Sequence, residues 1–278
     1  MAGKRLRRAT NVVAVGALLT LTIGSLFAPL IAPFDVDEPA AEGARPPCWP
    51  HIMGTDLAGR DLFSRILYGG RISFAVAIAG TLITLLIGAT YGAISGYLGG
   101  KLDNIMMRLV DILYGLPYMF FVIVLMALFE RRSIVLLFVA LGAVQWLTMS
   151  RIVRGQTLTV KQKEFVEAAR ACGAGPLRII FVHIMPHLAG PMIVYAFLSV
   201  PQIVMEEAFL SFVGLGVQPP DTSWGRLVME GVGGMADYPW LIIFPGLSLM
   251  LAMVSWNLVG DSLRDRFDPA MRGERQSS

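Results

Sequence analysis

The segment from Ile72 to Gly100 contains no Asp, Glu, Lys or Arg in 29 consecutive residues. About 20 apolar residues are enough for a helix to cross the hydrocarbon core of a bilayer, so this segment predicts a membrane-spanning helix. The composition agrees, because 55% of the residues are hydrophobic and 15% are charged, against roughly 25% charged in typical soluble domains. We therefore expect an all-α polytopic membrane protein.

Charge-poor stretches along the rest of the chain predict six transmembrane helices in all. The expected spans lie between Arg8 and Asp35, over Ile72–Gly100, from about Asn104 to Glu130, over Ser133–Ser150, from about His187 to Val213 and over Tyr238–Gly260. The first span also resembles a secretory signal peptide, because four basic residues precede its apolar run. The run is long and no clear small-residue cleavage site follows it, which favours an uncleaved helix.

The distribution of basic residues predicts the orientation. With the N-terminus in the cytoplasm, segments 1–8, 99–108, 151–186 and 261–278 are inside and carry 16 of the 23 Lys and Arg residues. Cytoplasmic segments normally hold this excess, so both termini are expected inside, with 35–71, 130–133 and 214–237 outside. Cys48 and Cys172 then lie on opposite sides of the membrane, which argues against a disulfide between them.

The outer segments carry more pattern than simple loops need. Apolar residues recur at helical spacing from Leu62 to Leu67, which predicts a short amphipathic helix lying along the membrane surface. Residues 214–237 hold six glycines together with Trp224, which is typical of a turn-rich surface element.

Ionisable residues near the spans are candidates for function or for bracing. Glu206 and Glu207 lie near the far end of the fifth span, where intramembrane acids are functional candidates by default. They either line a path near the outer gate, where they would receive a ligand's amino group, or reach the outer interface and brace a partner. Arg108 and Asp111 are one turn apart and predict a structural ion pair.

The segment between the fourth and fifth spans predicts two cytoplasmic helices. Glu164 to Cys172 is good helix-forming sequence, and Gly173 and Gly175 would end that helix. Pro176 can begin the next helix, expected over Leu177–Ile184, before Pro186 marks the turn into the fifth span. The surface around Ala168, Ala169 and Ala171, with Glu167 and Arg170 at its edge, suits docking of a partner. The alternative is a solvated connector.

The string Glu167-Ala168-Ala169, with Gly173 after it and Pro186 at the end, resembles the EAA loop of ATP-binding cassette (ABC) importer permeases. The usual ending is Ile-x-Leu-Pro, and here His183 and Met185 replace the Ile and the Leu. The resemblance implies a coupling helix that sits in a groove of a cytoplasmic ATPase. The residues it implies for coupling are Glu164, Glu167, Ala168, Ala169, Arg170, Gly173, Ile184 and Pro186.

Further strings look like the dipeptide/oligopeptide/nickel permease family, over residues 52–269. They are Gly54-Thr55-Asp56-x-x-Gly59-Arg60-Asp61, Phe212 to Gln218, Ser223-Trp224-Gly225 and Asn257 to Asp265. Two more, Tyr68 to Ser73 and Ser95 to Lys101, look closest to the C subunit of oligopeptide permeases. The combination is highly specific for the family.

This resemblance implies the type I ABC importer permease fold, with six transmembrane helices and cytoplasmic coupling helices. Residues 1–71 would form an N-terminal transmembrane helix and periplasmic linker, 72–265 the core permease domain with its EAA loop at about 161–187, and 266–278 a cytoplasmic tail. Glu206, Glu207 and Trp224 would belong to the translocation path or outer gate.

The implied function is import of oligopeptides across the bacterial cytoplasmic membrane. The implied partners are a second, homologous permease, two cytoplasmic ATPase subunits and an external solute-binding protein, with the lipid bilayer around them and no nucleic acid. No Gly-x-x-x-x-Gly-Lys-Ser/Thr string occurs, so we expect no ATPase site and no cofactor here, with ATP and Mg on the partner subunits. His183 and His187 are one turn apart but lack a third ligand, so no metal site is predicted.

The sequence leaves other functions open. Within the family, the substrate is alternatively a dipeptide, nickel, glutathione or an antimicrobial peptide. An ion-coupled secondary transporter is the alternative from another class, and it predicts inverted repeats and ion sites at the midplane. The sequence shows no convincing repeat, and its acids cluster near the ends of spans.

Overall fold

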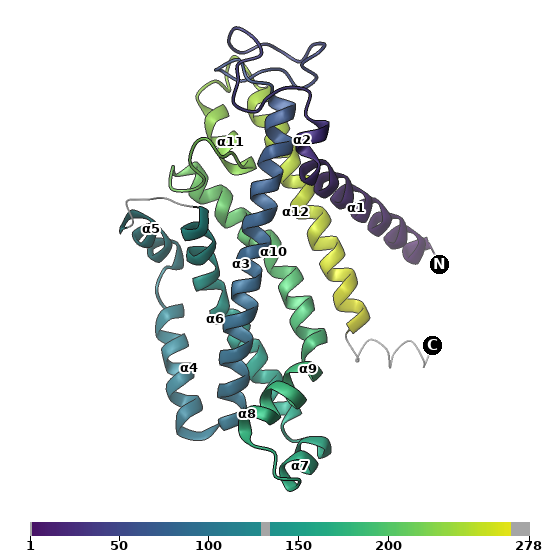
Figure 1. Cartoon of the computed structure of the whole chain (residues 1–278). Coiled ribbons are helices and arrows are strands. Elements are labelled where there is room, and N and C mark those ends of the chain that lie inside the picture. Colours follow the sequence, from purple (N-terminus) through teal and green to yellow (C-terminus); the bar gives the residue numbers. More distant parts are fainter. Residues whose placement is uncertain (1, 129–133, 268–278) are drawn as a thin grey trace. The chain divides into compact units, whose positions relative to one another are not determined.

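The computed structural model (Figure 1) describes residues 2–128 and 134–267, and over these residues the regular secondary structure is helical. The helices are α1 (Ala2–Leu26), α2 (Ala28–Ile31), α3 (Leu62–Leu98), α4 (Gly100–Tyr114), α5 (Tyr118–Leu128), α6 (Ile134–Val160), α7 (Glu164–Ala171), α8 (Pro176–Arg178), the π-helical turn η1 (Ile179–Ile184), α9 (Met185–His187), α10 (Ala189–Phe212), α11 (Trp224–Val232) and α12 (Trp240–Phe267). The predicted all-α class is confirmed. The predicted tail, residues 266–278, lies almost wholly outside the described residues.

Within the described residues, five helices are long and apolar enough to cross a bilayer. They cover Ala9–Leu26, Leu62–Leu98, Val135–Val160, Ala189–Phe212 and Trp240–Asp265. The pair α4 and α5 passes the same test as one bent span, which brings the count to the predicted six.

The bent span corrects one detail of the prediction. The sequence predicts a single span from about Asn104 to Glu130, whereas α4 and α5 meet at 82°. The break falls at Gly115 to Pro117, after the last residue of α4. Pro117 has no N–H to donate, and it disfavours the helical conformation for the residue before it, so the helix cannot continue straight through this point.

The chain forms two compact units. Of the described residues, 2–78, 126–128, 134–138 and 200–262 make the first unit, and 79–125, 139–199 and 263–267 make the second.

The core of the first unit surrounds Trp224, the first residue of α11, which is fully buried. Its indole Nε1 donates a 2.9 Å hydrogen bond to the backbone oxygen of Ile66 in α3, and its ring meets Phe74 edge to face at 5.2 Å. Leu227 of α11 and Leu241 of α12 belong to the same buried cluster. A large aromatic ring whose N–H is satisfied therefore joins α3, α11 and α12.

Asp61 determines where α3 begins. Its Oδ2 accepts hydrogen bonds from the backbone N and the Oγ of Ser64, each at 2.8 Å, which is the N-cap pattern. The helix therefore starts at Leu62, ten residues before the predicted span. Leu62 is 2% exposed. The prediction of a separate amphipathic helix on the membrane surface is wrong, because these residues are the buried first turns of α3.

In the second unit, glycines spaced four apart on α3 allow α6 to approach closely. A Cβ at Gly88 would lie 2.6 Å from the Cβ of Met149, and one at Gly96 would lie 2.9 Å from the backbone oxygen of Arg154. Gly92, between them, likewise faces the backbone of α6. Small residues at this spacing let two membrane helices bring their backbones together.

Ion pairs join α4 to α6 in the same unit. Arg154 donates from Nε and from a terminal nitrogen to the two carboxylate oxygens of Asp103, at 2.6 and 2.7 Å. Asp111 pairs with Arg151 at 2.9 Å. The predicted pair between Asp111 and Arg108 is therefore wrong, because the acid faces α6 rather than its own helix.

Candidate functional site

The segment from α7 to α9 forms the predicted pair of helices. α7 ends at Ala171, and Gly173 follows with φ +81°, a conformation that favours glycine. Pro176 occupies the first turn of α8, where its missing N–H costs nothing. The local signals in the sequence therefore predicted this part of the fold correctly.

The second helix differs in detail from its prediction. It takes π-helical form over Ile179–Ile184 and continues as α9 through Pro186 to His187. Pro186 does not mark a turn, because it stands in the first turn of α9, where no backbone N–H is required. Ile184 is fully buried, whereas Pro186 is exposed.

α7 presents most of the predicted coupling residues to the surface. Glu164, Glu167, Ala168 and Arg170 are exposed, and Ala169 is half-buried. The opposite side of the helix carries Val166, which is fully buried and packs in the core of the second unit. α7 is thus held by one face, and its other face is a shallow surface with charges of both signs.

Three contacts fix α7 and the turn before it to the rest of the second unit. The Nζ of Lys161 donates a 2.7 Å hydrogen bond to the backbone oxygen of Gly96 at the end of α3. The guanidinium of Arg170 lies 5.4 Å from the centre of the Tyr97 ring. On the other side, the Nζ of Lys163 lies 3.1 Å from the Nε2 of His187. A displacement of α7 would therefore strain contacts to α3 and to α9.

Large apolar side chains are exposed beside α7. Leu177 is 66% exposed, and Phe181 and Val182 are also exposed. The same short stretch buries Ile179, Ile180 and Ile184, so it is apolar on both sides. An apolar surface next to exposed charges is suited to contact with another protein.

Glu206, Glu207 and Trp224 all lie inside the first unit. Glu206 is 3% exposed and accepts a 3.1 Å hydrogen bond from the Nε2 of Gln202, one turn earlier on α10. Glu207 and Trp224 are fully buried. The structure brings these last two together, because the Oγ of Ser73 accepts a hydrogen bond from the backbone N of Trp224 and donates one to Glu207.

Glu207 is surrounded by serine hydroxyl groups. Ser211 and Ser223 each donate a 2.7 Å hydrogen bond to its Oε1, and Ser73 lies 3.5 Å from Oε2. Ser223 also caps α11, since its Oγ accepts from the backbone N of Arg226. The carboxylate on α10 therefore fixes the residue that starts α11. Ser211 lies one turn from Glu207 on α10, but Ser73 comes from α3 and Ser223 precedes α11, so the sequence alone could not show that all three serines surround this acid.

A cluster of charges that the sequence analysis did not predict ties the linker to α11. Arg65, 3% exposed, donates from one terminal nitrogen to Asp56 and to Glu230, each at 2.7 Å. Arg60 pairs with Asp56 at 2.8 Å, and Arg226 pairs with Glu230 at 2.7 Å. Burial raises the pKa of Glu230, but the hydrogen bonds and charges of Arg65 and Arg226 outweigh it, so the net pKa lies below the usual value.

No arrangement for a metal appears in the part of the chain that the structure describes. Within residues 2–128 and 134–267, no three His, Cys, Asp or Glu side chains are placed to hold an ion. His187 instead contacts Lys163 and stacks near Phe165, with ring centres 5.2 Å apart. The candidate site therefore consists of an exposed helical surface around α7 and a buried hydrogen-bond network around Glu207.

Comparison with known families decides what this arrangement belongs to. The family described as "Binding-protein-dependent transport system inner membrane component" matches residues 88–273, which include α7 to α12. The chain belongs to this family. It is therefore a membrane component of an ABC importer, embedded in the inner membrane through several apolar helices.

Relatives with printed names extend the similarity over nearly all of the chain. The oligopeptide transport system permease protein OppC of Haemophilus influenzae is 48% identical over 274 residues, covering 94% of this chain and 86% of the relative. OppC of Escherichia coli is 46% identical over 268 residues, covering 94% and 88%. The dipeptide transport system permease protein DppC of Bacillus subtilis is 41% identical over 257 residues, covering 92% and 80%.

Proposed function

We propose that this chain imports oligopeptides, as the membrane-spanning subunit of a complex with a second permease, two ATPase subunits and an external solute-binding protein. The names of the H. influenzae and E. coli relatives, at 48% and 46% identity over 94% of the chain, support this substrate class. The observation that carries the coupling part is α7, which is held by Val166 and offers Glu164, Glu167 and Ala168 to a partner.

In this proposal, residues 161–187 transmit ATP binding to the membrane helices. An ATPase that binds the exposed face of α7 would, when it moves, displace Arg170 of α7 and Lys161, which lies just before α7. Those two residues contact Tyr97 and Gly96 at the end of α3, so the movement would reach a membrane helix directly. ATP and Mg belong to the partner subunits, because the sequence lacks a P-loop.

The proposal places both chain termini in the cytoplasm and residues 35–71 outside, following the excess of basic residues. It keeps the predicted division into residues 1–71, 72–265 and 266–278. It also takes α1 as an uncleaved helix, and this is supported by Leu18 and Leu21, which pack against the cluster around Trp224.

In this proposal the outer gate is supported from inside the protein by three buried residues, Glu206, Glu207 and Trp224. Burial of all three favours a role in holding α11 over direct contact with the peptide. Glu207 holds Ser223 at the start of α11, and Trp224 fixes the same turn against α3. A gate built on α11 would therefore open as one element.

Peptide length separates the leading substrate from its alternative. The 41% identical DppC relative favours dipeptides as the second candidate. The test is uptake by proteoliposomes that contain both permeases and the ATPases, with binding protein outside and ATP inside. We expect tri- and tetrapeptides to enter only when the ATPases are present. If only dipeptides entered, the substrate class would be dipeptides and not oligopeptides. Uptake driven by a proton gradient without ATPases would refute the proposal.

A further inference from the structure

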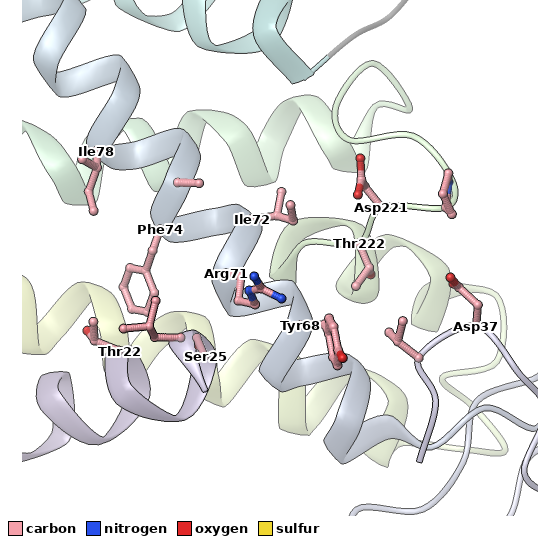
Figure 2. Close-up of a pocket in the computed structure, with 14 residues that line it drawn as sticks. Thr22, Ser25, Asp37, Tyr68, Arg71, Ile72, Phe74, Ile78, Asp221 and Thr222 are labelled. Atoms are coloured by element: carbon pink, nitrogen blue, oxygen red, sulfur yellow. The ribbon is translucent and has the colours of Figure 1, made fainter. Parts of the chain in front are cut away.

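A pocket of about 670 Å³ lies in the first unit between the end of α1, the first turns of α3 and the loop before α11 (Figure 2). α1 contributes Thr22, Ser25 and Leu26 to its wall. α3 contributes residues from Tyr68 to Ile78, and the loop contributes Pro220 to Thr222. The volume is within the range of pockets that hold small molecules.

Two helices independently place this pocket at the boundary between membrane and water. Arg71 is the last charged residue before the charge-free stretch that begins at Ile72. α3 has 37 residues and is about 55 Å long, against a hydrocarbon core of about 30 Å, so it extends beyond the core by about 12 Å at each end if it is centred. Arg71 lies about 14 Å from the start of α3. On α1, Ser25 lies next to the end of the apolar span Ala9–Leu26.

The pocket has a polar end and an apolar end. Figure 2 shows Asp37 and Asp221 on one side of the view, Phe74 and Ile78 with the hydroxyl residues Thr22 and Ser25 on the other, and Arg71 between the two sides. Arg71 is exposed and lies 5.7 Å from the centre of the Tyr68 ring. In the described part of the chain, Arg71 forms no ion pair, in contrast to Arg65 two turns earlier.

The two acids at the polar end are also available to a ligand. Asp37 and Asp221 are exposed, and in the described residues neither carboxylate forms a salt bridge. One guanidinium and two carboxylates that face the same space suit a head group with both a phosphate and an ammonium. Arginine binds phosphate through charge-assisted hydrogen bonds, and carboxylates do the same for ammonium.

We propose that this pocket binds the head group of a membrane aminophospholipid, with its phosphate on Arg71, its ammonium on Asp37 and Asp221, and its acyl chains beside Phe74 and Ile78. The end around Phe74 and Ile78 favours a lipid over a peptide, because the lining there offers the polar groups of a peptide backbone few partners besides the hydroxyl groups of Thr22 and Ser25. It favours a lipid over free phosphate, which would leave the apolar end empty. This proposal is independent of the transported substrate.

The test uses the full chain, purified in detergent, stripped of lipid and incubated with phosphatidylethanolamine or phosphatidylglycerol. Retained lipid is counted by native mass spectrometry. We expect the wild type to keep phosphatidylethanolamine in preference, and Arg71→Gln to lower its retention about tenfold, the effect of losing one charge-assisted contact. Arg264→Gln removes an exposed arginine of α12 outside the pocket, so it should retain lipid as the wild type does.

A second variant tests the ammonium part. Asp37→Asn combined with Asp221→Asn should abolish the preference for phosphatidylethanolamine and leave binding of phosphatidylglycerol intact. Arg71→Lys, which keeps the charge, should retain more lipid than Arg71→Gln and so shows that loss is not a folding defect. Wild-type retention in Arg71→Gln, or an equal loss in Arg264→Gln, would overturn the proposal. So would displacement of the lipid by trialanine, which would assign the pocket to the transported peptide.

Discussion

Arg65 and Glu230 are 165 residues apart in the sequence, yet their side chains meet at 2.7 Å. The string around Gly54 to Asp61 could be recognised as a pattern, but its physical use depends on a partner that no local signal identifies. Arg65 of α3 donates hydrogen bonds both to Asp56 of the linker and to Glu230 of α11. Contacts between distant segments are therefore the part of the site that the sequence could not provide.

Trp224 should contribute strongly to stability. Trp224→Ala removes a fully buried ring and the hydrogen bond to Ile66, which should lower the free energy of unfolding by about 3–5 kcal/mol. Trp49→Ala is the matched control, because that tryptophan is 89% exposed. Thermal unfolding of the two variants in detergent measures the difference. Equal midpoints would show that Trp224 does not hold the first unit together.

The Glu230 cluster predicts a dependence of stability on acid. Because the folded state lowers the pKa of Glu230, its contribution is complete above the ordinary value of 4.5 and declines as the pH falls below it. Glu230→Gln should therefore be less stable than the wild type at neutral pH, and the difference should shrink below pH 4.5. Melting curves of both proteins over this range provide the measurement. A difference that stays constant with pH would contradict the lowered pKa.

At the scale of elements, prediction succeeded where the signal was local. Gly173 and Pro176 correctly separated α7 from α8, since each acts on its own backbone conformation. Prediction failed where packing between distant segments determined the position of an element. α3 starts at Leu62 because Asp61 caps it and its first turns are buried, and neither fact is visible in the helical spacing of the apolar residues.

Gly173 and Gly175 provide a matched pair for the coupling helices. A Cβ at either glycine meets no atom within 4 Å, so only the backbone distinguishes them. Gly173 has φ +81°, whereas Gly175 has φ −69°, which any residue adopts. Gly173→Val should reduce ATP-driven peptide uptake several-fold by tilting α7, at a strain of about 1–3 kcal/mol, and Gly175→Val should transport normally. Similar uptake by both variants would show that the positive φ at Gly173 is not required for transport.

At the scale of the whole molecule, the native cysteines report the orientation. Cys48 and Cys172 are both exposed, and they lie on segments predicted to face opposite sides. Single-cysteine chains, made by Cys48→Ser or Cys172→Ser, allow each to be labelled separately in intact cells. We expect an impermeant maleimide to label Cys48 directly and Cys172 only after permeabilisation. The reverse pattern would invert the topology.

The central claim is that α7 couples this permease to ATP hydrolysis, and Glu167 tests it most directly. The measurement is peptide-stimulated ATP hydrolysis by the assembled complex, in parallel with peptide uptake. Glu167→Lys reverses an exposed charge on the docking face and leaves the buried Val166 in place. Glu38→Lys makes the same change at an exposed acid of the linker.

Both variants should insert and remain folded, as judged by protease protection and thermal unfolding. We predict that Glu167→Lys loses stimulated hydrolysis and uptake together by about tenfold or more, as expected when a charged contact in an interface is reversed, whereas Glu38→Lys keeps both. Wild-type hydrolysis and uptake in an assembled Glu167→Lys complex would contradict the account and leave α7 as a connector between two membrane helices.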